Sequence, residues 1–392
     1  MADMPAHPPH EPNAEKIAAF LARNALRPSA LPLMHSFARQ RFPGQEVVPA
    51  PFQGYCSYTL VLLGADGRRD SGCDVDEGEG EGKGRLVQFR PRRHGIDVKV
   101  CEEAREVLGG GVVPFVEDLG VLEGLETDGG CEGEMCGYVV ERVGGVSLTD
   151  YRAGGETSEG RRKVVRDLAG VFARSWEGRR DPAAVVKGKV GGSLRWRLEM
   201  MLQGLPAEFR PVVRRVLREM DEIEGSAWVV THGDLVPDNI MVDETGGLVG
   251  LIDWAEAEWL PFGVGMYGLE EVLGEDVSVD DKLSGTSRFE YYPDAAELRA
   301  LFWDEVGRAV DDEEVVSKAK LAQVLGVLLW RGIAFDDGAL GRVVDPEQDW
   351  WDIQRLRAWL FHERGLGMVS RREWWWESVW RGLFGWFRWC WK

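Results

Sequence analysis

The sequence predicts an α+β fold made of two lobes, and three features of the chain indicate it. The first third contains mostly short apolar runs typical of strands, with one helix among them, whereas the remainder has helical periodicity. One hairpin that carries acidic residues, 228–263, interrupts the helical part. We therefore expect an N-terminal extension with one helix at 1–44, a small lobe with an antiparallel sheet at 45–143, and a large, mainly helical lobe at 144–392.

Composition limits the classes of function. The 392 residues are enough for about two domains. The 66 acidic residues outnumber the 47 basic ones and give a formal net charge of −19, and such a surface repels phosphate backbones. We therefore expect no nucleic acid partner. The chain starts without a basic segment followed by an apolar core and has no run of ~18 apolar residues, so we expect a soluble, cytoplasmic protein.

In the small lobe, runs rich in β-branched and aromatic residues predict the strands. Residues 98–108 predict its helix, which ends at three consecutive glycines. Two Gly- and acid-rich stretches, 66–84 and 123–137, have too few apolar residues to pack and are expected to be solvated loops. The strands are expected at 58–63, 85–89, 112–122 and 138–143.

In the large lobe, apolar residues at helical spacing predict the helices, as for Val165, Leu168 and Phe172. The last 21 residues, 372–392, contain seven tryptophans. Three interpretations of this Trp-rich tail stay open, the third of which is a poorly ordered chain end. We favour packing onto the helical lobe over an amphipathic segment in a membrane interface, because no polar face is clearly separated.

The strongest chemical signal is the hairpin WVVTHGDLVPDNIMVDETGGLVGLIDWAEAEWLPFG at 228–263. Residues 240–243 and 248–252 predict its two arms, which a Thr-Gly-Gly turn connects. Because the arms are antiparallel, the residue before the first arm, Asn239, is expected beside the residue after the second, Asp253. Amide and carboxylate oxygens are ligands that Mg²⁺ prefers, so Asn239 and Asp253 are candidate metal ligands.

Two further residues of this segment are candidate catalytic residues. Asp234 lies five residues before Asn239, and His232 is expected to brace the loop by hydrogen bonds. The spacing His-x-Asp-x-x-x-x-Asn, followed by a strand pair and a second Asp, is that of the catalytic and metal loops of kinases. In that chemistry the first Asp accepts or orients the hydroxyl proton of the acceptor, and the metal neutralises the nucleotide phosphates. The pattern therefore predicts ATP and Mg²⁺ as cofactors.

With His-Gly-Asp at 232–234 and Ile-Asp-Trp at 252–254, the sequence resembles the aminoglycoside phosphotransferase and choline kinase family. The resemblance covers about 45–335, and the Gly- and acid-rich inserts are similar to those of divergent fungal members. It implies a bilobal protein-kinase-like fold and Mg-ATP-dependent transfer of the γ-phosphoryl group to a hydroxyl of a small molecule. It also implies Asp234 as the catalytic base.

The resemblance further implies a nucleotide site in the small lobe. Gly54 and Ser57 fall where the family has its loop over the phosphates, although a plain turn before a strand is equally compatible. Arg90 stands where the family has a phosphate-binding Lys, and its longer, planar head is not a neutral replacement. Glu103 is its expected carboxylate partner, with a solvated acidic helix face as the alternative.

The strand at 138–143 resembles the one that leads into the linker between the lobes. Val140 is expected to form the apolar wall of the adenine pocket. Backbone groups of Glu141 and Val143 are expected to bond the adenine edge. An ordinary buried strand that ends at a Gly-Gly turn remains an alternative.

On the acceptor side, Glu256 and Glu258 follow Asp253 and could hold an amine-bearing substrate, or form an exposed acidic turn. The acidic residues of 268–282 allow a cation-favouring rim or plain solubility. Two other functions stay open: a nucleotide-binding protein without transfer activity, because of Arg90, and a membrane-docked scaffold that uses the Trp-rich tail. A protein kinase is disfavoured, since no Asp-Phe-Gly to Ala-Pro-Glu segment follows the hairpin.

Overall fold

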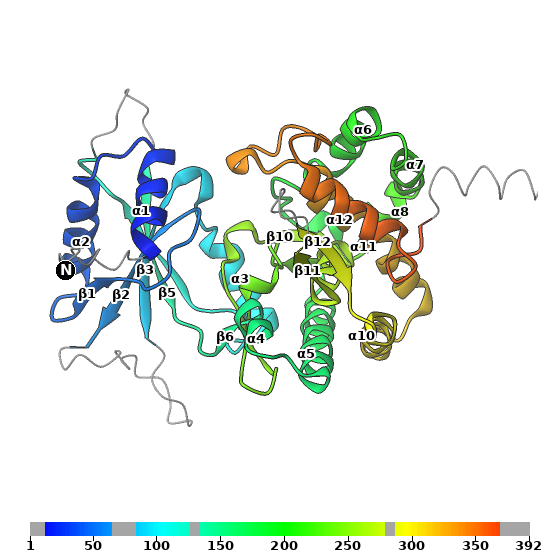
Figure 1. The fold of residues 1–392 in the computed structure, drawn as a ribbon, viewed down its shortest axis with the longest axis horizontal. Coiled ribbons are helices and arrows are strands. Elements are labelled where there is room, and N and C mark those ends of the chain that lie inside the picture. The colour runs from blue at the N-terminus through cyan, green and yellow to red at the C-terminus, as the bar shows by residue number, and fades with distance from the viewer. Residues whose placement is uncertain (1–11, 65–83, 126–133, 279–286, 369–392) are drawn as a thin grey trace, which may run out of the picture. The chain divides into compact units, whose positions relative to one another are not determined.

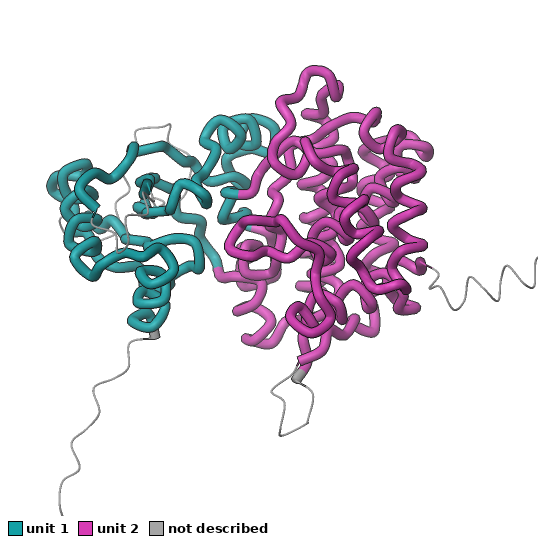
Figure 2. Tube along the Cα trace, turned by 90° about the horizontal axis from the view of Figure 1, so that it is seen from above, with its two compact units in different colours: residues 1–145, 249–255 teal, residues 146–248, 256–392 magenta. Residues whose placement is uncertain are grey.

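A computed structural model of the chain describes residues 12–64, 84–125, 134–278 and 287–368. The chain divides into two compact units, which Figure 2 shows in different colours. Unit 1 comprises 1–145 and 249–255, and unit 2 comprises 146–248 and 256–392. The predicted tail at 372–392 lies outside the described residues, as do nearly all of the loop at 66–84 and the middle of the loop at 123–137.

Unit 1 is built on a five-stranded antiparallel sheet in the order β1-β2-β3-β5-β4 (Figure 1). In its centre, Val87 on β3 lies opposite Leu60 on β2 and Val139 on β5, and all three are buried. The expected strands and the helix at 98–108 are present, some with shifted ends. The elements of unit 1 are α1 (Pro12–Arg23), α2 (Ala30–Arg41), β1 (Glu46–Pro49), β2 (Tyr58–Leu63), β3 (Arg85–Pro91), α3 (Val98–Leu108), β4 (Val116–Val121) and β5 (Met135–Glu141).

The first 44 residues contain two helices in the structure, where the sequence predicted one. The second, α2, buries Ala30, Met34 and Ala38, which are four residues apart and therefore share one face. With Phe20 of α1 they form a core cluster with sheet residues such as Phe89. Pro32 falls in the first turn of α2, where a proline is tolerated because its missing N–H has no partner within the helix. Pro32 is therefore compatible with this second helix, which the sequence did not predict.

Unit 2 is mainly helical, and helix α5 confirms its predicted face, with Val165, Leu168 and Phe172 buried. Strand β7 pairs with β10, β6 with β8, and β11 with β12, all antiparallel. Its elements are β6 (Val146–Ser147), α4 (Leu148–Ala153), α5 (Ser158–Glu177), α6 (Leu194–Gly204), α7 (Arg210–Arg218), α8 (Met220–Glu224), β7 (Trp228–Thr231), η3 (Pro237–Asn239), β8 (Ile240–Val242), β10 (Glu258–Pro261), η5 (Val264–Tyr267), α9 (Gly268–Val272), β11 (Gly274–Ser278), β12 (Ser287–Tyr291), α10 (Ala295–Val310), α11 (Glu313–Gly332) and α12 (Trp350–Phe361).

The chain passes from unit 2 to unit 1 and back through β9 (Leu248–Leu251) and the residues after it. The fold is α+β, as predicted, with a sheet-based unit 1 and a mainly helical unit 2. The pairing of β11 with β12 was not predicted, because β11 carries mostly acidic and polar residues and the apolar alternation of β12 is limited to Phe289 and Tyr291. No helix within the described ranges is long and apolar enough to span a bilayer.

Candidate active site

The loop after β7 begins with a backbone conformation that only glycine adopts readily. All four residues of β7 are buried, and His232 directly after it is also buried. Gly233 then has φ +80°, and a Cβ built on it would lie 1.9 Å from the carbonyl oxygen of Glu256. Steric exclusion of a side chain therefore explains the glycine of His-Gly-Asp, and the turn at this glycine places Asp234 at the start of the loop.

The backbone around Asp234 is held by several hydrogen bonds. The Asp234 N–H donates to His232 Nδ1 at 3.2 Å, which requires the neutral imidazole to carry its proton on Nε2. The N–H of the next residue, Leu235, donates to the Tyr267 hydroxyl at 2.9 Å. The Asp234 carbonyl accepts from the N–H of Val236 at 3.1 Å. His232 thus lies where a brace of the loop was expected, and Tyr267 is a further contact that the sequence did not suggest.

Asn239 contacts Asp234 directly. It ends η3 and is 8% exposed. Its Nδ2 donates to the Asp234 carbonyl oxygen at 2.8 Å and to Asp234 Oδ2 at 3.0 Å. These bonds orient the Asp234 carboxylate, and because they engage the amide nitrogen, Oδ1 is the end of the carboxamide suited to a cation.

Asp253 follows β9 and belongs to unit 1. It has φ 62°, a left-handed conformation that Asp adopts more readily than most residues, and such strain is common at functional sites. Its Oδ1 accepts from the Arg90 guanidinium at 2.6 Å. The Arg90 side chain is 3% exposed and that of Asp253 37%. Arg90 is also fixed by Gln88, whose Oε1 accepts from Nε at 3.1 Å.

The structure therefore brings the predicted residues together in two pairs. Asp234 contacts Asn239 within unit 2, and Asp253 contacts Arg90 within unit 1. The convergence of the two pairs on one nucleotide stays a prediction. So does the pairing of Arg90 with Glu103, which lies half-buried on α3.

Each of the two predicted metal ligands, taken by itself, has a donor type that fits Mg²⁺, which is bound in proteins by one or two carboxylates together with substrate phosphates and water. Within the described part of the chain, no three His, Cys, Asp or Glu side chains gather as a metal cluster. A site dependent on protein ligands alone, as for zinc, is therefore not indicated there. The carboxamide oxygen of Asn239 and the carboxylate of Asp253 supply hard oxygen donors of the type that Mg²⁺ requires.

The expected phosphate loop connects β1 to β2 and is held by one buried side chain, that of Gln53. Its Nε2 donates to the carbonyl oxygens of Ala50 and Thr59, and its Oε1 accepts from the Thr59 N–H at 2.9 Å. Ser57 is buried, and its hydroxyl lies 3.4 Å from that of Thr59. A Cβ on Gly54 would lie 3.3 Å from the Ser57 Oγ. The loop is thus ordered by its own polar side chains instead of a string of glycines.

At the end of β5, one of the two hydrogen bonds with the neighbouring segment is made by a side chain and not by the backbone. The Glu141 N–H donates to the Phe115 carbonyl oxygen at 2.8 Å, but the Phe115 N–H donates to the Glu141 carboxylate at 2.9 Å. Val140 and Val143 are half-buried. Because the Glu141 N–H already has a partner, any adenine contact of this residue would use its carbonyl. The adenine site stays a prediction.

The acceptor-side carboxylates are mostly bound within the protein. Glu258 is 8% exposed, and its carboxylate accepts from the N–H groups of Val190 and Gly191 at 2.9 and 2.8 Å. These contacts contradict an exposed acidic turn at Glu258, and the holding of an amine-bearing substrate by this residue stays a prediction that they do not support. Glu256 is exposed.

The expected acidic rim at 268–282 also differs, because Glu270 and Glu271 are buried among arginines. Arg299 donates to Glu270 Oε2 at 2.7 Å, and Arg355 to Glu271 Oε2 at 2.7 Å. Burial acts to raise the pKa of Glu271, but the Coulombic attraction and the hydrogen bonds of Arg331 and Arg355 together lower it below its usual value. These two residues form a buried ionic core, whereas Glu275 is exposed and the acidic residues at 280 and 281 lie outside the described residues.

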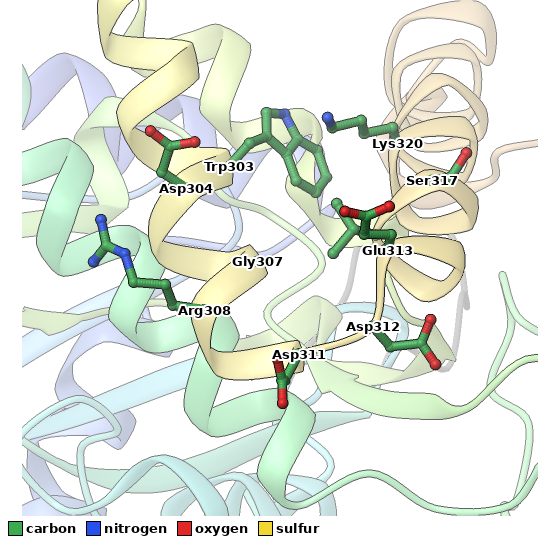
Figure 3. Close-up of a pocket in the computed structure, with 10 residues that line it drawn as sticks. Trp303, Asp304, Gly307, Arg308, Asp311, Asp312, Glu313, Ser317 and Lys320 are labelled. Carbon is green, nitrogen blue, oxygen red and sulfur yellow. The ribbon is translucent and has the colours of Figure 1, made fainter.

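A pocket of about 720 Å³ lies between α10 and α11, and none of the residues that line it is a predicted site residue (Figure 3). Its wall includes the Trp303 ring, and the Lys320 ammonium lies 5.2 Å from the centroid of that ring. Four acidic residues line it beside two basic ones. The residues that line this pocket offer no group for phosphoryl transfer beyond those already present in the loop after β7.

Among curated proteins, none matches the chain. Among solved structures, the aminoglycoside 2′-phosphotransferase-IIIa complex with GDP is similar with 13% identity, covering 82% of this chain and 95% of that one, at a TM-score of 0.47. A putative aminoglycoside phosphotransferase from Ralstonia eutropha shows 15% identity, 86% and 97% coverage, and a TM-score of 0.47.

These TM-scores lie below 0.5, so the resemblance to a known family rests on sequence. Residues 107–264 match the model of the phosphotransferase enzyme family. This segment contains His232, Asp234, Asn239 and Asp253. The resemblance predicted from the His-Gly-Asp and Ile-Asp-Trp motifs is thereby confirmed, and residues 107–264 of the chain are similar to the phosphotransferase enzyme family.

Proposed function

We propose that this protein transfers the γ-phosphoryl group of ATP to a hydroxyl group of a small molecule, in a Mg²⁺-dependent reaction. The observation that carries the proposal is the contact of Asn239 Nδ2 with Asp234 Oδ2, inside a segment that matches the phosphotransferase family. This contact supports the role of Asp234, because a base must be oriented before it can accept a proton.

In the proposed reaction the acceptor oxygen attacks the γ-phosphorus of ATP while the bond from that phosphorus to the bridging oxygen of the β-phosphate breaks. The hydroxyl proton passes to the Asp234 carboxylate, and ADP and a phosphate ester leave. Asn239 and Asp253 would hold Mg²⁺, which when bound neutralises phosphate charge. Arg90 would bind phosphate oxygens in place of the family Lys, since a guanidinium can form two parallel hydrogen bonds.

The proposed acceptor is a hydroxyl compound without a defined charge preference. Glu258 is committed to backbone N–H groups and Glu270 and Glu271 to arginines, which removes most of the support for an amine-bearing substrate. The exposed carboxylate of Glu256 is the remaining support for an amine.

The test is ATP turnover against a panel of amino alcohols, sugars and aminoglycosides, with and without Mg²⁺. Asp234→Asn and Asp253→Asn are each expected to lower turnover by about 100-fold or more. Asp238→Asn is the matched control, because Asp238 is an exposed acid in the same loop. Wild-type turnover in Asp234→Asn would contradict the assignment.

A second candidate function is nucleotide binding without transfer, and the ion pair of Arg90 with Asp253 favours it. This pair occupies one oxygen of the expected metal ligand with a cation of the protein itself. Mg-ATP binding in a thermal-shift assay, combined with no ATP consumption across the acceptor panel, would support this candidate. ADP formation with any acceptor supports transfer.

A further inference from the structure

The Asp234 loop rests on a short segment that follows β10, and the two are in close contact. Tyr267 ends η5, is 4% exposed and accepts the Leu235 N–H at 2.9 Å. Leu235 is also buried. A backbone N–H in such surroundings needs a partner, because leaving it unsatisfied costs free energy.

Two glycines around Tyr267 allow this close approach. A Cβ on Gly265 would lie 2.5 Å from Thr231 Cγ2, at the end of β7. A Cβ on Gly268 would lie 2.5 Å from Leu235 Cδ2. The sequence Gly265-Met-Tyr-Gly268 therefore fits against both ends of the segment that carries His232 and Asp234.

Helix α11 fixes this segment from the other side. The Trp330 ring stacks on the Tyr267 ring, with centroids 4.8 Å apart and planes 19° apart. Gln323 is 1% exposed, and its Nε2 donates to the Met266 carbonyl oxygen at 3.1 Å. A Cβ on Gly326 would lie 1.9 Å from the Val264 carbonyl oxygen, so helix and segment are in direct contact. The Tyr267 ring and the backbone beside it are thus held by contacts with α11.

We propose that Tyr267 is a positioning residue, which fixes the Asp234 loop by accepting the Leu235 N–H and is itself held by Trp330 of α11. The expected effect of Tyr267 on turnover rests on the proposed function, whereas its expected effect on the conformation of the loop does not. Burial, followed by the charge of Asp234, raises the pKa of Tyr267 well above its usual value. The phenol therefore stays neutral, and the positioning does not depend on pH in the physiological range.

The test compares Tyr267→Phe with Tyr291→Phe. Both tyrosines are buried in unit 2, but the Tyr291 hydroxyl donates to the Glu270 carboxylate of α9 and not to the backbone of the loop. Amide hydrogen exchange of the peptide 233–239 is expected to be at least tenfold faster in Tyr267→Phe and unchanged in Tyr291→Phe. In the transfer assay, Tyr267→Phe is expected to lower kcat at least tenfold with KM for ATP within twofold of wild type.

Unchanged exchange of 233–239 in Tyr267→Phe overturns the inference, and so does wild-type kcat in a variant whose exchange is accelerated. If the wild-type protein transfers no phosphate, the proposed function fails, and the exchange experiment still decides the inference. Trp330→Leu is the second variant, because it removes the stacking partner and leaves the hydroxyl. It is expected to accelerate exchange in the same peptide by a smaller factor.

Discussion

Arg90 Nη2 lies 2.6 Å from Asp253 Oδ1, and this ion pair connects β3 to the residue that follows β9. The two residues are 163 positions apart in the chain. The guanidinium is almost wholly buried, whereas the carboxylate is over one third exposed. Arg90 thus satisfies its own charge with the carboxylate that we propose as a metal ligand, and the nucleotide and the metal would have to share this pair.

We expect Arg90→Ala to destabilise the protein by about 2 kcal/mol, since the hydrogen bond to a charged group is lost and a partly exposed carboxylate remains. Arg90→Lys should recover part of this stability, because an ammonium keeps the charge but not the fork geometry. Urea unfolding measures both. Arg93→Ala is the control, because Arg93 is exposed. Equal stability of Arg90→Ala and Arg93→Ala would show that the pair contributes little.

Gly233→Ala is expected to disrupt the loop of Asp234. Its Cβ would overlap the Glu256 carbonyl oxygen, and φ +80° is unfavourable for alanine. We expect a loss of about 2–3 kcal/mol in the free energy of unfolding together with a loss of turnover. Gly111→Ala is the control, because nothing lies within 4 Å of the Cβ position there. An equal effect of the two substitutions on the melting temperature would contradict this argument.

Much of the site could be predicted from sequence, because its parts are local. His232, Asp234 and Asn239 lie within eight residues, so their spacing alone limits which contacts they form. The strands of unit 1 could be predicted for a similar reason, since β-branched runs bounded by turn residues are a local signal.

The rest depends on partners far along the chain. Tyr267 lies in an apolar segment and looks like a core residue until the fold places its hydroxyl against the Leu235 N–H, 32 positions away. Glu271 looks like a surface acid, and only the packing of α12 brings Arg355 to it from 84 positions away. Local composition contains no signal for such pairs. The acidic type of Glu271 predicted an exposed side chain, and that prediction was wrong.

Gln53→Met is expected to weaken nucleotide binding. The Gln53 carboxamide satisfies the Thr59 N–H and two carbonyl oxygens, and Met offers no comparable groups. The loop between β1 and β2 should therefore lose its fixed conformation. We expect about a tenfold higher Kd for a fluorescent ATP analogue, or ~1.4 kcal/mol. Gln40→Met, at an exposed position of α2, should bind as wild type does. Unchanged Kd in Gln53→Met would show that this loop does not form the nucleotide site.

Gly307→Ala is expected to stabilise the protein. Gly307 lies within α10 at the edge of the pocket in Figure 3, and nothing lies within 4 Å of its Cβ position. Alanine loses less backbone entropy than glycine on forming a helix, so we expect a gain of about 0.5–1 kcal/mol in the free energy of unfolding. Thermal unfolding monitored by circular dichroism measures it. A lower melting temperature would indicate that the pocket needs the space.

Glu258 should make stability depend on pH in a defined direction. Burial raises the pKa of Glu258 above its ordinary value near 4.5, so the folded state binds more protons than the unfolded state above that pH. The free energy of unfolding contributed by this group therefore falls as pH rises from about 4.5. Glu258→Gln has no charge to titrate, and its stability relative to wild type should improve between pH 4.5 and 7.5.

Urea unfolding of both proteins at four pH values in this range measures the difference. Glu258→Gln loses one of two acceptors for the N–H groups of Val190 and Gly191, so its stability starts lower at pH 4.5. The slope with pH, and not the absolute value, is the informative quantity. Glu199→Gln on the exposed face of α6 should follow the wild-type slope. A difference between Glu258→Gln and wild type that stays constant with pH would mean that the buried carboxylate is ionised throughout, held by its two backbone donors against the cost of burial.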